Sequence, residues 1–146
     1  MKYGIEVFGH TTKSNIKILQ TLQNKSLKVL FNKDWYTPTL ELHNELNMLK
    51  LDDNFNHSLL QIAYMQRNNL LPSIFDDFLI LRSQIHNRQT RYAQQINIPM
   101  SKSKYGTNTL SYKGAKLYNN LPEEIKGALS LSSFKRKLKQ YYLDRY

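Results

Sequence analysis

The sequence contains no cysteine, which excludes disulfide bonds, cysteine-based zinc sites and thiol catalysis. It also lacks any apolar run near the roughly 20 residues that a membrane-spanning helix needs. The mean hydropathy of −0.58 also argues against a membrane protein. The residues after Met1 do not form the hydrophobic segment of a signal peptide. We therefore expect a nuclear or cytoplasmic chain that is not secreted and has no membrane partner.

Acidic residues are scarce too. The 146 residues include 11 Asp and Glu against 21 Lys and Arg, which gives a formal net charge of +10. Such an excess favours a polyanionic partner such as RNA or DNA, bound mostly through its phosphates. The alternative is a soluble basic protein with no such partner. The hydrophobic fraction of 40% suffices for one lean core, so we expect a single domain over residues 1–146.

Apolar periodicity predicts a mainly α fold, a compact bundle of about five to seven short helices. We expect a helical half at 10–82, a loop-rich connector at 83–113 with room for one short hairpin, and terminal basic helices at 114–146. Residues 3–9 alternate loosely between apolar and polar. They fit a short strand, or the tail of an element that began before Met1.

The clearest helix pattern runs from Ser14 to Asn32. On a helical wheel its apolar residues share one broad side, and lysines take the other. The apolar residues are Ile16, Ile18, Leu19, Leu22, Leu27, Val29 and Leu30. The lysines are Lys13, Lys17, Lys25 and Lys28. This lysine face is either the solvated side of an ordinary surface helix or a surface that contacts phosphates.

Capping residues and prolines predict where the other helices begin and end. Thr37-Pro38 predicts the start of a second helix, and Asp52 or Asp53 is expected to cap a third. Because the residue before a proline avoids the helical region, Pro72 ends that third helix. Ser73 is expected to cap a short helix through about Leu81.

The last helix is predicted to begin after Ser130, which can serve as its N-cap. Its apolar face consists of Phe134, Leu138, Tyr141 and Tyr142. Basic residues cover the remainder, namely Lys135, Arg136, Lys137 and Lys139. Such a cluster contacts a nucleic-acid backbone, acts as an import signal or is simply solvated.

Paired aspartates at Asp76 and Asp77 invite comparison with a polymerase palm, where such a pair holds two magnesium ions. Here they follow Pro72 and Ser73, so we expect them to serve a helix start. The four histidines have no metal-ligand spacing and are expected to be ordinary surface or loop residues. They are His10, His43, His57 and His86. No Gly-rich phosphate loop or nucleophile elbow occurs. We therefore predict no enzyme, no catalytic residue, no metal site and no cofactor in this chain.

Arg88 and Arg91 bracket a polar turn, and Tyr92 follows the second arginine. Arginine can fork onto phosphate, and tyrosine can stack on an unpaired base. Alternatively, Arg91 ties the loop to a helix C-terminus. The predicted nucleic-acid-binding residues are Lys13, Lys17, Lys25, Lys28, Arg88, Arg91, Lys135, Arg136, Lys137 and Lys139.

Several short motifs follow one another in a characteristic order. They are residues 3–9, residues 22–25, residues 69–72, His86 with Thr90-Arg91, and residues 114–125 followed by residues 130–139. Together they resemble the C-terminal end of the reverse transcriptase of jockey-like non-LTR retrotransposons. Phe8 and Tyr118 stand where tryptophan is usual in that family.

The resemblance implies a region behind the thumb of an RNA-directed DNA polymerase. The active-site residues, and the magnesium of the palm, would then lie before Met1. It further implies template RNA or nascent duplex as partner, bound through backbone contacts, and the polymerase core as a second partner. The alternatives are a helical module that docks onto the polymerase core, and a reused stand-alone nucleic-acid-binding domain.

Overall fold

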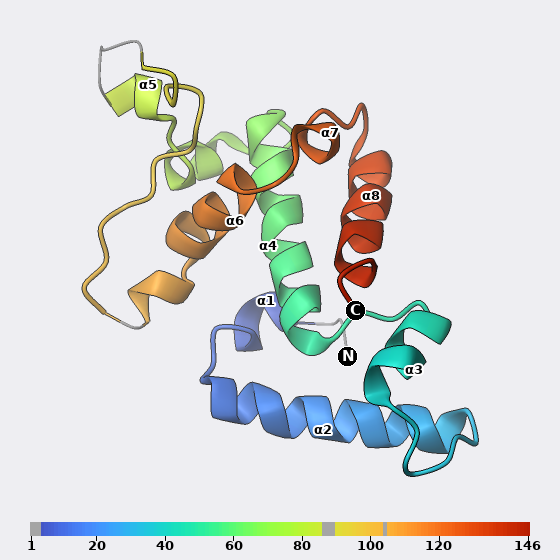
Figure 1. The fold of residues 1–146 in the computed structure, drawn as a ribbon. Coiled ribbons are helices and arrows are strands. Elements are labelled where there is room, and N and C mark those ends of the chain that lie inside the picture. Colours follow the sequence, from blue (N-terminus) through green and yellow to red (C-terminus); the bar gives the residue numbers. More distant parts are fainter. Residues whose placement is uncertain (1–3, 86–89, 104) are drawn as a thin grey trace. The chain divides into compact units, whose positions relative to one another are not determined.

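The computed structural model describes residues 4–85, 90–103 and 105–146 (Figure 1). The longer helices are α2 (Lys13–Leu30), α3 (Thr39–Glu45), α4 (Leu51–Arg67) and α8 (Leu131–Leu143). The shorter ones are α1 (Ile5–Phe8), α5 (Arg82–Ile85), α6 (Ala115–Asn119) and α7 (Glu123–Lys126). Two 3-10 turns, Ser73–Phe78 and Gly106–Asn108, and a π turn, Leu110–Gly114, complete the list. Because the described residues form helices and no strand, the mainly α prediction is confirmed.

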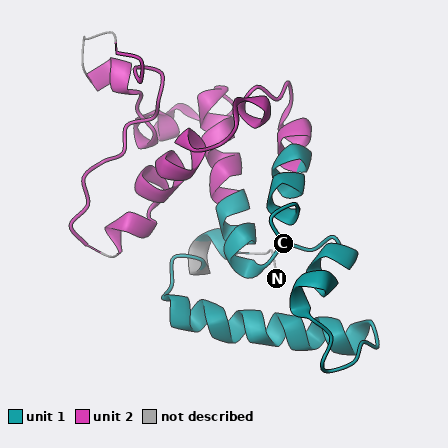
Figure 2. Cartoon of the chain, viewed as in Figure 1, with its two compact units in different colours: residues 1–57, 136–146 teal, residues 58–135 magenta. Residues whose placement is uncertain are grey.

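The chain divides into two compact units (Figure 2). Unit 1 comprises residues 1–57 and 136–146, and unit 2 comprises residues 58–135. Unit 1 therefore holds α1, α2, α3, the beginning of α4 and most of α8. The predicted organisation as a single domain, with its three subdivisions, stays a prediction.

In unit 1 the first described element is a helix, not a strand. Residues Ile5–Phe8 form α1, so the strand reading of residues 3–9 is wrong. Gly9 follows directly and is buried against Phe55, where a Cβ atom would lie 2.2 Å from the Cδ2 atom of the ring. No other residue fits that approach without displacing the ring. The imidazole of His10 then packs edge-on against the same ring, with 5.0 Å between centroids.

The predicted helix at Ser14–Asn32 is confirmed as α2, but its apolar side is not buried as a whole. The buried residues are Ile16, Gln23 and Leu27. In contrast, Ile18, Leu22 and Val29 are 62%, 48% and 75% exposed. At 100° per residue these three lie roughly opposite Leu27 on the wheel. The single broad apolar face that the sequence suggested is therefore two faces, one of them in solvent.

Helix boundaries differ from the cap predictions in detail. Helix α4 starts at Leu51, so Asp52 and Asp53 lie inside its first turn instead of capping it. In that position the positive end of the helix dipole still stabilises their negative charges. The helix ends at Arg67, ahead of Asn69 with φ 54°, which agrees with the predicted end before Pro72.

Ser73 opens a 3-10 turn that ends at Phe78, and no side-chain cap bond forms there. The short helix expected after Pro72 is therefore present as a 3-10 element that ends before Leu81, and the prediction that Ser73 caps it is wrong. Asp76 lies in the first turn of this short element. At the other end of the chain, the backbone N–H of Ser133 donates to the hydroxyl of Ser130 over 3.2 Å, so the predicted cap of α8 is confirmed.

Two histidines contradict the surface prediction. His43 is 1% exposed and His57 is 8% exposed. Nδ1 of His43 lies 3.0 Å from the carbonyl oxygen of Met48, and Nε2 lies 3.0 Å from the Asn24 side-chain oxygen. A buried imidazole is tolerated where both ring nitrogens have polar neighbours. His10 is half-buried, and His86 lies outside the described residues.

Tyr146 fastens the start of α4 within unit 1. Its hydroxyl donates to Oδ2 of Asp53 (2.7 Å) and accepts the backbone N–H of Lys50 (2.8 Å). The Lys50 ammonium also lies 4.4 Å from the centroid of the Tyr146 ring. Burial raises the pKa of this phenol, the Lys50 N–H lowers it, and Asp53 raises it further. The phenol therefore stays protonated and keeps its donor role.

Unit 2 packs around the second half of α4. The rings of Tyr64 and Phe134 stack with 4.2 Å between centroids, and the Tyr64 hydroxyl donates to the carbonyl of Ala128 over 2.6 Å. Leu60 and Ala63 are fully buried on the same helix. This stacked pair joins α4, the α7–α8 connection and the first turn of α8 into one core.

Near the centre of the chain two short segments meet at an isolated bridge, and one of its two residues lies outside the predicted connector at 83–113. Leu81 and Ile96 form an antiparallel bridge, and the N–H of Arg82 donates to the carbonyl of Gln95 over 3.0 Å. The side chain of Asn119 on α6 makes two hydrogen bonds to the backbone of Ile96, of 3.0 and 2.8 Å. These two hydrogen bonds hold the segment that carries Arg91 against α6.

Candidate nucleic-acid interface

Helix α2 presents the first group of predicted residues. Lys13, Lys17 and Lys25 are exposed and Lys28 is half-buried. The helix contains no acidic residue. At 100° per residue, three of these lysines fall within about 60° of one another and Lys25 lies a further 60° around the wheel. The four ammonium groups therefore line one long side of α2 with no carboxylate on that helix to neutralise them.

An aromatic residue that the sequence reasoning missed lies beside these lysines. Trp35 is 60% exposed, and its ring lies 5.7 Å from the Lys25 ammonium and 5.9 Å from that of Lys28. Lys28 also donates to the carbonyl of Trp35. Next to it, Tyr36 is 90% exposed. Exposed aromatic rings beside cations suit stacking on unpaired bases. The available signal was a Trp-Tyr pair in a short polar connection.

The basic cluster of α8 is dispersed around its helix. Lys135, Arg136 and Lys137 are exposed and Lys139 is half-buried. Consecutive helical residues point about 100° apart, so the first three cannot contact one surface together. Lys135 and Lys139 are four residues apart and share a side. Their role in nucleic-acid binding stays a prediction.

In unit 2, the predicted Arg91 lies at a cluster of cations around one exposed ring. Tyr92 is 49% exposed, with the guanidinium carbon of Arg91 at 5.9 Å from its centroid and that of Arg82 at 6.0 Å. The sequence reasoning paired Arg91 with Tyr92 but missed Arg82, which the antiparallel pairing brings back to the same ring. The predicted Arg88 lies outside the described residues.

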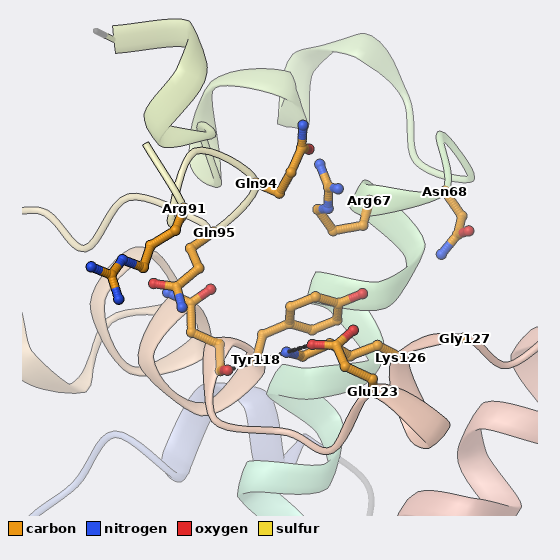
Figure 3. A pocket seen from close by; sticks show the side chains of 10 residues that line it. Arg67, Asn68, Arg91, Gln94, Gln95, Tyr118, Glu123, Lys126 and Gly127 are labelled. Carbon is orange, nitrogen blue, oxygen red and sulfur yellow. Dashed lines mark hydrogen bonds and ion pairs between the residues drawn. The ribbon is translucent and has the colours of Figure 1, made fainter. Parts of the chain in front are cut away.

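A pocket of about 510 Å³ adjoins this cluster in unit 2 (Figure 3). Its lining is almost entirely polar: Arg67, Asn68, Arg91, Gln94, Gln95, Tyr118, Asn119, Glu123, Lys126 and Gly127. These residues come from the end of α4, residues 91–95, and the α6–α7 region. No motif in the sequence connects those three stretches.

Tyr118 forms the floor of the pocket and is only 8% exposed. Burial raises the pKa of its phenol, and the positive charge of the nearby Arg67 guanidinium lowers it in part. Beside the ring, Lys126 pairs with Glu123 (2.8 Å) and donates to the carbonyl of Asn119 (3.2 Å). Figure 3 shows the ring between Arg67 and this ion pair, whereas the Arg91 guanidinium is directed away on the opposite side.

No group of three or more potential metal ligands occurs within residues 4–85, 90–103 and 105–146. Over the same ranges, no helix has the length and apolar character to cross a membrane.

Comparison with known proteins gives one partial similarity. The chain is 31% identical over 71 residues to the RNA-directed DNA polymerase from mobile element jockey of Drosophila melanogaster. The match covers 49% of this chain and 8% of that polymerase, so the chain corresponds to a small part of its relative's length. No family model matches, and no solved structure matches. The motif-based expectation is thus supported as a weak, partial resemblance to a non-LTR retrotransposon reverse transcriptase.

Proposed function

We propose that this chain is a non-catalytic, C-terminal region of a non-LTR RNA-directed DNA polymerase that grips template RNA or nascent duplex through phosphate contacts. The observation that carries the proposal is the acid-free lysine side of α2, in a chain that resembles the jockey polymerase over 71 residues. Catalysis, and the magnesium it needs, belong to other parts of the parent enzyme.

The dimensions of α2 suit this role. Lys13 and Lys28 are 15 residues apart, which corresponds to roughly 22 Å along a helix. Phosphates of one strand follow one another at about 3.4 Å along a B-form duplex. The lysine side can therefore follow several phosphates of a single strand or cross a duplex groove. Flexible ammonium groups make such contacts without reading sequence.

A matched pair of double variants tests the proposal. K13Q/K17Q removes two exposed lysines of α2 and leaves the Lys25 and Lys28 contacts with Trp35 intact. K102Q/K116Q removes the same charge from exposed lysines outside α2. The measurement is the affinity for a labelled RNA hairpin and a DNA duplex at several salt concentrations between about 50 and 200 mM.

If the lysines contact phosphates, K13Q/K17Q should reduce the slope of log affinity against log salt by about 1.4–1.8, since each lost contact accounts for 0.7–0.9. The K102Q/K116Q control should keep the slope of the parent chain. Affinity that is insensitive to salt, or an equal change in both double variants, would contradict the proposal.

A second candidate function is docking onto the polymerase core. The specific observation is the solvent-exposed apolar stripe of Ile18, Leu22 and Val29 on α2. We expect an I18S/V29S variant to lose co-purification with a co-expressed polymerase core and to keep its RNA affinity. Retained co-purification of that variant, at parental folding stability, would rule out this candidate.

A further inference from the structure

We infer that the pocket of unit 2 holds one unpaired nucleotide, its phosphate at Arg91 and its base among the amides of Asn68, Gln94 and Gln95. This inference deepens the proposed function and rests on it, since it adds a base-contacting site to a chain proposed to grip phosphates. The pocket takes its residues from three segments that only the fold of unit 2 brings together.

The charge of the lining favours an anion. Among the ten lining residues are three cations and one carboxylate. Lys126 and Glu123 offset each other in a 2.8 Å ion pair. The excess positive charge therefore belongs to the guanidinium groups of Arg67 and Arg91. A planar guanidinium can hold two phosphate oxygens at once, which makes arginine the preferred side chain for that group.

The remaining lining favours a base over a bare anion. Gln94 and Gln95 each offer both amide donors and a carbonyl acceptor, the complement of a base edge. Asn68 offers its carbonyl oxygen and one amide hydrogen, because its Nδ2 already donates to the carbonyl of Tyr64 over 2.8 Å. Asn119 does not take part, because its amide is committed to the backbone of Ile96. The volume of about 510 Å³ lies within the range of small-molecule sites, about 300–1,000 Å³. An inorganic phosphate would leave most of it empty.

The arrangement in Figure 3 also suits an extended ligand. Arg91 and Gln95 lie on one side, whereas Arg67 and Tyr118 lie on the other. The exposed Arg91 side chain, whose guanidinium is directed outward, has to turn inward to meet a phosphate in the pocket. A ligand that contacts both sides carries its charge and its hydrogen-bonding edge at separate ends, as a nucleotide does. On the Arg91 side, Tyr92 offers a half-exposed ring on which the adjoining base of a single strand can stack.

The test uses the full chain and four probes: adenosine 5′-monophosphate, uridine 5′-monophosphate, the unphosphorylated nucleosides, and inorganic phosphate. Affinities come from amide chemical-shift titration. We expect the monophosphates to bind and to shift amides of residues 91–95 and 118–127. R91Q should weaken them about tenfold or more, the usual cost of losing a charge-assisted hydrogen bond. Q94A should change the ratio between the two monophosphates.

R82Q is the matched control, because Arg82 contacts the same Tyr92 ring but does not line the pocket. It should leave mononucleotide affinity unchanged. Inorganic phosphate binding as tightly as the monophosphates would reduce the site to an anion site and overturn the inference. Unchanged affinity in both R91Q and Q94A would overturn it as well.

The two proposals fail separately. K13Q/K17Q should not affect mononucleotide binding, because neither lysine lines the pocket. A chain that keeps salt-dependent RNA binding but binds no mononucleotide refutes only the pocket inference. A chain that binds mononucleotides but shows no lysine-dependent salt slope refutes only the phosphate grip of α2.

Discussion

Helices α2 and α4 are almost equal in length, 18 and 17 residues, yet they are used in opposite ways. Helix α2 buries three residues, one of which is a glutamine. The buried residues of α4 are Leu51, Asn54, Phe55, His57, Leu59, Leu60, Ala63, Tyr64 and Gln66. Burial on this scale surrounds α4 with protein, whereas most of the circumference of α2 faces solvent.

The difference shows that a helix can be long and periodic without forming the core. In α4 nearly every apolar residue is enclosed. In α2 the lysines and the stripe of Ile18, Leu22 and Val29 stay outside. A stripe of that kind is not needed to hold the chain together, so its residues are available to a partner. Mutations should therefore damage stability in α4 and binding in α2.

The largest expected effect comes from truncating leucines on the two helices. Leu60 of α4 is fully buried, so L60A should lower the free energy of unfolding by about 2–5 kcal/mol through lost contacts and a residual cavity. Leu22 of α2 is 48% exposed, and L22A should change it by about 0.5 kcal/mol or less. Urea unfolding of both variants measures the contrast. Equal losses would show that α2 is buried in solution and would undo the comparison.

The existence of these helices was predictable from the sequence, and their burial was not. Periodicity shows that one side of α2 is apolar, but it does not show how much of that side meets a partner. Gln23 is buried while its neighbour Leu22 is exposed. The glutamine is retained inside because its amide can donate to the carbonyl of Leu49, at 3.4 Å. This hydrogen bond joins residues that are 26 positions apart, and a local sequence pattern cannot predict such a contact.

The residues of the candidate site were likewise predicted only in part from the sequence. Charge and composition pointed to Lys13 and Arg91, both of which are exposed. Arg67, Arg82 and Lys126 were missed because no local pattern marks them. They become neighbours of predicted residues only through long-range contacts, such as the two hydrogen bonds between Asn119 and Ile96. Histidine burial was missed for a similar reason, since the polar partners of His43 come from other segments.

A smaller effect is expected where Tyr146 holds the first turn of α4. Y146F removes a hydroxyl that both donates to Asp53 and accepts from Lys50. It should lower the free energy of unfolding by about 1–2 kcal/mol, because both partners lose a hydrogen bond in a part-buried place. Tyr36 is 90% exposed, so Y36F is a matched control with the same atomic change and no expected loss. Indistinguishable urea midpoints for the two variants would contradict this role of Tyr146.

The smallest effect is a pH dependence that belongs to His43, the buried imidazole of α3. Burial lowers its pKa below the ordinary 6.5; the Met48 carbonyl raises it, Lys50 lowers it and Asp53 raises it by lesser amounts. Above pH 6.5 the imidazole is neutral in both states, and its contribution to stability is complete. As pH falls below 6.5, the unfolded chain takes up the proton first, so stability is lost until the folded-state pKa is passed. Urea midpoints between about pH 7 and 5 should therefore decline in the parent chain. The decline should be smaller in H43Q, whereas an identical decline in H43Q would assign it to other groups.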